Sequence, residues 1–265
     1  MDDGAEEVLY GGVANAGAVV RRGPHVLRPS NEHSSSILSF LGQIEAAGFD
    51  GAPSPVGLDP DGRERLVHIP GDVAIPPYPE WVQTDDALAS IAVLIRRLHE
   101  ASSLVDTRAM TWSTEMVDPE GGPVICHNDV CLENVVFRDG RAVALLDFDF
   151  AASGRPTYDL AAFARMCVPI DDDVNATKLG WAPADRPRRL RSVCDAYGLD
   201  TGERTDVLES LDAAIAAGGE FVRRHVEAGE EGFVKMWQEM GGMERFDRRR
   251  RWWAENRGRF AAALV

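Results

Sequence analysis

The stretch that decides the fold is residues 126–149, which read Cys-His-Asn-Asp-Val-Cys-Leu-Glu-Asn-Val-Val-Phe-Arg-Asp-Gly-Arg-Ala-Val-Ala-Leu-Leu-Asp-Phe-Asp. Asp139 and Gly140 give a strong signal for a two-residue hairpin turn, because they stand between two apolar runs that suit antiparallel strands. A hairpin closed at this turn is expected to place Asn134 opposite Leu145.

Three oxygen-bearing side chains are expected at the open end of this hairpin. Asp147 follows Leu145 by two residues, so its side chain is on the same face as that of Asn134, with the two backbones within about 7–8 Å of each other. Asp129 lies on the loop that leads into the same end. Since Mg²⁺ prefers hard oxygen ligands, the pattern predicts a magnesium site at this end of the hairpin.

The segments from His127 to Asn134 and from Asp147 to Asp149 resemble the catalytic and metal-binding segments of the protein-kinase-like superfamily. They are most similar to those of aminoglycoside phosphotransferases and their choline kinase relatives. The resemblance implies that Asp129 accepts the proton of a substrate hydroxyl, while Asn134 and Asp147 hold Mg²⁺ against the nucleotide phosphates. It also implies that Asp149 contacts a second metal ion.

The same resemblance implies structural roles for His127, which braces the catalytic loop, and for Asp159, which supports it. The alternative is that the Asp and Asn residues of this stretch only form turns and caps, which is common for these residue types. Their joint spacing, placed after a β-rich region and a helix, favours the catalytic interpretation.

The order of elements also points to two lobes. From Val8 to Ile69 the sequence indicates three strands, a helix over about 34–47 and two more strands. From Thr84 onward the apolar residues recur at helical spacing. We therefore expect an α+β, two-lobed, protein-kinase-like fold, with a small β-rich lobe over 1–71 and a larger, mainly helical lobe over 72–265.

The residues expected to bind the nucleotide are assigned through the resemblance. Residues 11–17, with Gly12 and Asn15, resemble the glycine-rich hairpin that covers the phosphates. Protein kinases place a lysine on the third strand, but this chain has no lysine before Lys178. Arg28 on the expected third strand is the candidate in its place, because a guanidinium group binds phosphate in a bidentate manner.

The glutamate that normally pairs with this cation is not identified by the sequence. Glu45 on the expected helix and Glu32 before it are both candidates. The hinge between the lobes is expected at residues 66–71, where backbone groups near His68 and Ile69 would contact an adenine or guanine base.

The acceptor side is less defined. Residues 171–173 are three consecutive aspartates, which either meet the amino groups of an acceptor or form a solvated helix cap and linker. Phe233, Met236, Trp237 and Met240 form a helical stripe that is typical of a core. The arginines at 248–251 are expected to form salt bridges with acidic neighbours.

The overall charge excludes some partners. The formal net charge of −15 and the pI near 4.8 argue against binding to nucleic acid or to an anionic membrane, and they are compatible with a cationic acceptor. The longest apolar run, Ala87 to Ile95, is too short for a membrane span. The four cysteines show no C-x-x-C spacing, so they are expected to be reduced thiols of a cytoplasmic protein.

These observations together predict a kinase that uses Mg²⁺ and ATP or GTP to phosphorylate a hydroxyl group of a small molecule. An aminoglycoside-like acceptor would make it an antibiotic resistance enzyme. A choline, homoserine or nucleoside kinase shares the same motifs and stays open as an alternative. A non-catalytic nucleotide-binding module is a second alternative, and a scaffold without ligands ranks last.

Overall fold

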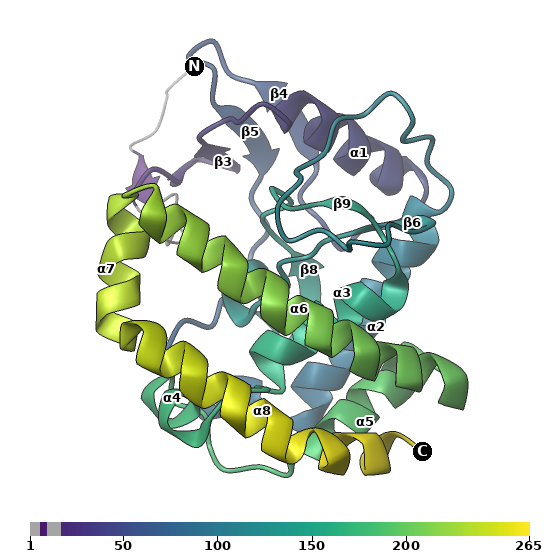
Figure 1. Cartoon of the computed structure of the whole chain (residues 1–265). Helices are drawn as coiled ribbons and strands as arrows, with labels where there is room; N and C mark the ends of the chain where they lie inside the picture. Colours follow the sequence, from purple (N-terminus) through teal and green to yellow (C-terminus); the bar gives the residue numbers. More distant parts are fainter. Residues whose placement is uncertain (1–5, 10–16) are drawn as a thin grey trace.

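The computed structural model describes residues 6–9 and 17–265, so Gly12 and Asn15 of the expected glycine-rich hairpin lie outside the described residues. The N-terminal part is an antiparallel sheet with the strand order β1-β2-β3-β5-β4. Its strands are β1 (Glu7–Val8), β2 (Val20–Arg22), β3 (His25–Arg28), β4 (Pro55–Leu58) and β5 (Glu64–Val67), and α1 (Ser34–Ala46) lies between β3 and β4 in the chain. This order agrees with the sequence prediction (Figure 1).

The helix α1 forms where the apolar spacing predicts it. Ile37, Leu41 and Ile44 recur on one face and are buried in the core. The helix ends before Gly48, whose positive φ of 93° is a conformation that glycine adopts without strain.

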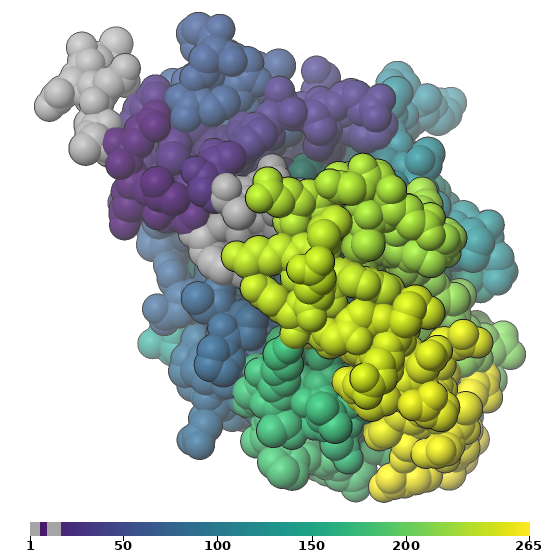
Figure 2. Space-filling model, turned by 60° about the vertical axis from the view of Figure 1, so that its left-hand side comes forward, coloured from purple at the N-terminus to yellow at the C-terminus, as the bar shows by residue number. Residues whose placement is uncertain are grey.

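The remainder of the chain is mainly helical and holds two short strand pairs. Its elements are η1 (Glu80–Gln83), α2 (Asp85–Ser102), β6 (Val124–Cys126), η2 (Leu132–Asn134), β7 (Val135–Arg138), β8 (Arg141–Leu145), β9 (Ala152–Gly154), α3 (Pro156–Cys167), α4 (Asp173–Lys178), α5 (Arg186–Tyr197), α6 (Thr201–Glu227), α7 (Glu231–Met240) and α8 (Gly242–Leu264). α6 packs along α3, and α7 turns the chain back into α8 (Figure 1). Figure 2 shows α7 and α8, in yellow-green and yellow, covering one face of the molecule.

The hairpin β7–β8 has the expected turn but a different register. Asp139 and Gly140 both have positive φ, as a turn of this type requires. The expected pairing of Asn134 with Leu145 is wrong, because Val135 faces Leu145 and the carbonyl of Asn134 accepts a hydrogen bond from Leu146 N at 2.8 Å. The cause is a bulge, since Val143 has no partner between the paired Ala142 and Ala144 and so shifts the register by one residue.

The chain passes from the sheet to the helical part along the hairpin. Asp72 and Phe137 exchange two backbone hydrogen bonds, of 2.9 and 2.8 Å. Gly71 lies so close to β7 that a Cβ atom there would be 2.6 Å from the carbonyl oxygen of Phe137. The lobe boundary near residue 71 stays a prediction, although all the paired strands before it belong to the first sheet.

Membrane insertion through a helix finds no support in the described part of the chain. None of the helices there combines the length and the apolar character that a membrane span needs.

The close contact between Gly122 and Gly154 provides a test of the packing around β6 and β9. A Cβ atom at Gly122 would lie 2.1 Å from the carbonyl carbon and oxygen of Gly154, so we expect Gly122→Ala to lower the free energy of unfolding by about 1–3 kcal/mol or more. Gly258 in α8 has no atom within 4 Å of such a Cβ, and Gly258→Ala should raise the free energy of unfolding by about 0.5–1 kcal/mol. Urea denaturation of both variants measures the difference, and equal effects would contradict this packing.

Candidate active site

The loop after β6 is held by one buried carboxylate. Asp159, near the start of α3, accepts hydrogen bonds from the backbone N–H groups of His127, at 2.9 Å, and Asn128, at 2.8 Å. Asn128 has a positive φ of 63°, an unusual conformation for a residue other than glycine. The two bonds therefore fix a loop conformation that the backbone alone does not favour.

Asp159 is itself oriented by a buried histidine. Oδ2 of Asp159 lies 2.9 Å from Nε2 of His99, and Nδ1 of the same ring lies 2.7 Å from the hydroxyl of Tyr197. Burial raises the pKa of Asp159, but the hydrogen bond from His99 and the backbone bond from His127 outweigh it and hold the pKa below its usual range. The predicted supporting role of Asp159 agrees with these contacts.

Cys126 brings a thiol close to His99 and Asp159, and the three ligand atoms lie within 4.8 Å of one another. Burial raises the pKa of the Cys126 thiol well above its usual value, so the thiolate that a metal ion requires is disfavoured. The carboxylate oxygens of Asp159 are already used by backbone N–H groups and His99. This cluster is therefore a structural support for the loop.

His127 joins the loop to the segment after β8. Its Nε2 lies 2.8 Å from the carbonyl oxygen of Leu146, and its ring packs against Phe148 with a centroid distance of 4.6 Å. Burial lowers the pKa of His127, which keeps the ring neutral at pH 7. The bracing role expected for this histidine agrees with both contacts.

Asp129 and Asn134 lie side by side, as the sequence predicts. The amide nitrogen of Asn134 donates to the carbonyl oxygen of Asp129 at 3.0 Å and to its carboxylate at 3.1 Å. Burial, and then the nearby charge of Asp147, raises the pKa of Asp129 to about 7, although Arg165 and Asn134 act in the opposite direction. A carboxylate with a pKa near neutrality suits a general base.

The structure brings Asp147 and Asp149 together through Arg28. Nη1 of Arg28 lies 3.1 Å from Oδ1 of Asp147, and Nη2 donates a hydrogen bond to Asp149. Asp147 has a positive φ of 61°, and such backbone strain is found mostly at functional sites. Arg28 is 7% exposed, so the cation on β3 is buried between the sheet and the end of the hairpin.

The oxygen atoms at the open end of the hairpin fit a magnesium ion. Asp149 Oδ1 is buried and has no hydrogen-bond partner among the described residues. Asn134 uses its amide nitrogen for Asp129, so its amide oxygen is the atom available to a metal ion. Two carboxylates and an amide oxygen make the hard donor set that Mg²⁺ prefers, with water and phosphate oxygens completing the coordination.

Glu64 is the glutamate that the sequence did not identify. It lies opposite Arg28 in the β3–β5 register, is 1% exposed, and approaches Arg28 Nε to 3.5 Å. Glu45 instead accepts a hydrogen bond from Ser54, and Glu32 lies near His33 at the surface. The carboxylate that pairs with Arg28 therefore lies on the neighbouring strand β5, and not on or just before the helix α1, where the two candidates from the sequence lie.

The hinge residues are placed at the end of β5. The backbone N–H of His68 donates to the carbonyl oxygen of Pro24 at 2.9 Å, so this donor is already used within the sheet. Ile69 is half-buried beside it. Their contact with a nucleotide base stays a prediction.

The aspartates at 171–173 are paired with arginines. Asp171 is buried and contacts Arg245 at 3.4 Å, while Asp172 caps α4 and contacts Arg248 at 3.4 Å. Asp173 pairs with Arg186 at 2.9 Å. Asp172 caps α4 as expected, but the segment is not solvated, because Asp171 and Asp172 are buried. Of the salt bridges expected for the arginines at 248–251, those of Arg248 and Arg249 are confirmed.

The stripe on α7 is only partly core. Phe233 is buried, as expected, whereas Met236, Trp237 and Met240 are half-buried. The three half-buried side chains line a small depression together with Arg245 of α8.

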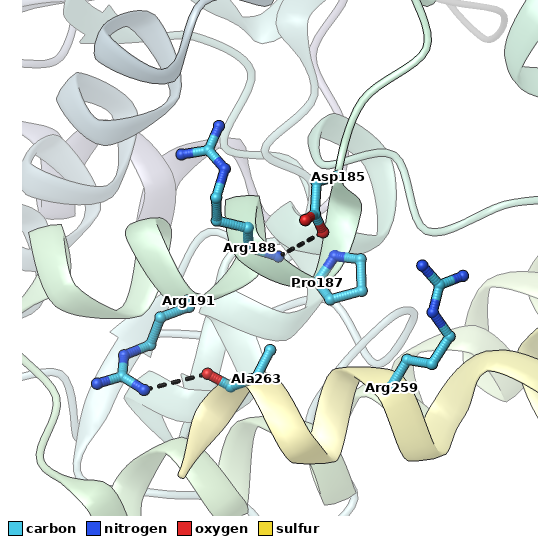
Figure 3. Close-up of a pocket in the computed structure, with 6 residues that line it drawn as sticks. All are labelled: Asp185, Pro187, Arg188, Arg191, Arg259 and Ala263. Atoms are coloured by element: carbon cyan, nitrogen blue, oxygen red, sulfur yellow. Dashed lines mark hydrogen bonds between the residues drawn. The ribbon is translucent and has the colours of Figure 1, made fainter.

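A groove of about 320 Å³ lies between α5 and α8, lined by Asp185, Pro187, Arg188, Arg191, Arg259 and Ala263 (Figure 3). The side chain of Asp185 accepts a hydrogen bond from Arg188 N, and Arg191 donates to the carbonyl oxygen of Ala263, each at 3.1 Å. None of the described residues that were predicted for the active site lines this groove. It is therefore not part of the candidate active site.

Comparisons with known proteins agree with this geometry. A model of the phosphotransferase enzyme family, APH, matches residues 79–203. The trifolitoxin immunity protein of Rhizobium leguminosarum bv. trifolii is 32% identical over 200 residues, which cover 73% of this chain and 75% of that protein.

Solved structures give the same picture of the fold. A choline/ethanolamine kinase family protein from Mesorhizobium loti has a TM-score of 0.66 at 16% identity, covering 98% of this chain and 92% of that one. The GDP complex of the wild-type aminoglycoside 2′-phosphotransferase-IIIa has a TM-score of 0.57 at 14% identity, covering 91% of this chain and 92% of that one. These likenesses confirm the predicted two-lobed, protein-kinase-like fold.

The carboxylate of Asp159 provides a test of how the loop is held. We expect Asp159→Ala to lower the free energy of unfolding by about 3 kcal/mol or more, because two buried N–H groups lose their acceptor. The native pKa of Asp159 lies below its unfolded value, so this loss is fully present at neutral pH and shrinks as the pH falls below about 4.

Denaturation with urea at pH 7 and at pH 3 measures both effects. Asp106→Ala is the control, because the partner of Asp106 in the described part of the chain is the exposed Arg108, and its loss should leave the free energy of unfolding nearly unchanged. A loss for Asp159→Ala as small as that of the control would contradict the supporting role.

Proposed function

Because the chain belongs to the phosphotransferase enzyme family, we propose that it transfers the γ-phosphoryl group of ATP or GTP to a hydroxyl group of a small molecule. Family membership confirms the resemblance inferred from the sequence and the expectation of a kinase. The observation that supports the specific reaction is the meeting of Asp129, Asn134, Asp147 and Arg28 at the end of one hairpin.

Asp129 is proposed to accept the proton of the acceptor hydroxyl. Its pKa of about 7 lets it take up a proton near neutral pH, and its bond to Asn134 orients the carboxylate. Asn134, Asp147 and Asp149 would hold Mg²⁺, which neutralises phosphate charge when it is bound. Phosphoryl transfer requires mainly positioning and charge compensation, and these residues supply both.

Arg28 is proposed to take the place of the kinase lysine. It contacts Asp147 and Asp149 on one side and Glu64 on the other, so one cation faces three carboxylates. This excess of negative charge favours a divalent cation at the site. The guanidinium fork is suited to phosphate oxygens once a metal ion shares the carboxylates.

The donor and the acceptor are proposed by analogy with relatives. Among related structures, aminoglycoside 2′-phosphotransferase-IIIa is in complex with GDP, and APH(2″)-IIa forms a ternary complex with ATP and streptomycin. The similarity to an immunity protein supports a protective role, in which the toxic compound is the acceptor. The likeness to a choline/ethanolamine kinase family protein supports a metabolite kinase as the second candidate.

The catalytic assignment is tested by nucleotide consumption with Mg²⁺ against aminoglycosides, nucleosides, amino alcohols and hydroxy acids. We expect turnover with one acceptor class and a loss of roughly 100-fold or more in kcat for Asp129→Ala. Asp206→Ala, which removes an exposed carboxylate from α6, should keep full activity. Turnover that persists in Asp129→Ala would exclude Asp129 as the base.

The metal assignment is tested without turnover. Mn²⁺ binding followed by electron paramagnetic resonance, with ADP present, should weaken by roughly 10-fold or more in Asp147→Ala, because a ligand carboxylate is lost. Asp206→Ala again serves as the control. Equal Mn²⁺ affinity in Asp147→Ala and the wild type would contradict the proposed site.

If the wild type turns over none of the acceptors, calorimetric titration with ATP and GTP separates the alternatives. Tight, Mg²⁺-dependent binding would support a nucleotide-binding module. No binding at all would contradict the assignment of Arg28, Asn134 and Asp147 to a nucleotide site.

A further inference from the structure

A buried arginine near the candidate base has no hydrogen-bond or ion-pair partner among the described residues. Arg165 on α3 is 7% exposed, and it makes no hydrogen bond or ion pair within residues 6–9 and 17–265. Its Nε atom is buried without an acceptor. Burying a charge without a partner costs several kcal/mol, so such a residue calls for an explanation.

The neighbouring helix is shaped around this guanidinium group. Gly218 of α6 lies against Arg165, and a Cβ atom at this position would be 2.7 Å from Nη1 of Arg165. A larger side chain at Gly218 would push the guanidinium group away. The packing of α3 on α6 therefore makes room for the cation but supplies no carboxylate for it.

Arg165 lies near the candidate base, because α3 packs against the loop that carries Asp129. Two residues after Arg165, the thiol of Cys167 donates to the carbonyl oxygen of Val130 at 3.7 Å. Burial lowers the pKa of Arg165, while the charges of Asp129 and Asp171 raise it and that of Arg245 lowers it. Asp147, Asp149 and Glu64 surround Arg28 instead. The charges that act on Arg165 are therefore those of Asp129, Asp171 and Arg245, whereas Asp147 and Asp149 are paired with Arg28.

The carboxylates on this side are already engaged. Asp171 contacts two arginines of α8, namely Arg245 at 3.4 Å and Arg249 at 3.7 Å. Asp172 contacts Arg248. Burial, together with the charge of Arg165, lowers the pKa of Arg249 to about 10, while Asp171 and Asp172 act in the opposite direction. Arg248 also pairs with Glu244 at 3.3 Å, so the cluster holds four arginines, at 165, 245, 248 and 249, and three carboxylates, at 171, 172 and 244.

We propose that Arg165, next to Asp129, binds an anionic group of the acceptor, so that the substrate is a small molecule with both a hydroxyl and a carboxylate or phosphate. This inference rests on the proposed function, because it takes Asp129 as the base that defines the acceptor side. It replaces the cationic acceptor that the net charge of −15 suggests, since Arg165 places a positive charge beside Asp129 on the acceptor side. An anion would supply the counter-charge that Arg165 lacks in the described part of the chain.

The test uses calorimetry on the full chain loaded with Mg²⁺ and the non-hydrolysable ATP analogue AMPPNP. The probes are inorganic phosphate and glycerate as anions, glycerol as the neutral match and ethanolamine as a cation. We expect an anion to bind more tightly than glycerol and ethanolamine, and Arg165→Met to weaken it roughly 10-fold or more. Arg250→Met, an exposed arginine on α8, is the matched control and should leave the affinity unchanged.

Stability separates ligand binding from a structural role. Because Arg165 has no partner to lose, we expect Arg165→Met to leave the free energy of unfolding unchanged or to raise it. Arg165→Lys keeps the charge without the planar fork, and should restore part of the anion affinity. A loss of stability in Arg165→Met, with anion affinity unchanged, would overturn the proposal.

Two further sets of titrations distinguish an anionic acceptor from the nucleotide γ-phosphate as the group that Arg165 binds. If Arg165→Met weakened binding of Mg²⁺–AMPPNP but not of Mg²⁺–ADP, and left the probe anions unaffected, Arg165 would serve the nucleotide γ-phosphate and the proposal would be wrong. The same titrations without nucleotide test the anion site independently. A wild type that binds anions but no nucleotide would contradict the proposed function and support the anion site. Equal binding of glycerate and glycerol, with no binding of phosphate, would overturn the anion site.

Discussion

The bonds from two consecutive backbone N–H groups to the carboxylate of Asp159 are the constraint on which the candidate site depends. They hold His127 and Asn128 in place, and the conformation of Asn128 with its positive φ turns the chain toward Asp129. His99 contacts this carboxylate and is itself contacted by Tyr197, so side chains from α2, α3 and α5 together hold the loop. A base positioned in this way needs little reorganisation when a substrate binds.

A second set of contacts connects the sheet with the hairpin. The side chain of Arg28 on β3 forms ion pairs with Asp147 and Asp149, and Glu64 on the neighbouring strand β5 forms a third. The N-terminal sheet and the end of β8 are thus joined by charge as well as by the apolar core, in which Leu66 of β5 and Leu145 of β8 belong to one cluster. Both the proposed phosphate contact and the proposed metal ligands share this small group of side chains, so a change in one of them alters the charge that the others experience.

Much of the site can be predicted from the sequence, because its residues lie close together along the chain. The spacing of Asp129, Asn134 and Asp147 identifies the family, and the absence of an early lysine points to Arg28. Glu64 is missed because its pairing with Arg28 depends on a cross-strand contact between distant segments. The pairing of the aspartates at 171–173 is missed for the same reason, because their arginine partners lie on the distant helices α5 and α8. For Arg165, the signal in the sequence is a charged residue within an otherwise apolar stretch of α3.

The unpaired Val143 in β8 sets the spacing between the two ends of the hairpin. This extra residue shifts the register of β8 by one, so that the backbone N–H of Leu146 donates to the carbonyl oxygen of Asn134. Asp147 is the next residue in the chain. Removing one residue from this strand would displace Asp147 by about 3.3 Å along the strand relative to Asn134, a shift larger than the length of a metal–oxygen bond. Insertions and deletions here are therefore far more harmful than substitutions, and the length of β8 is under tighter constraint than its composition.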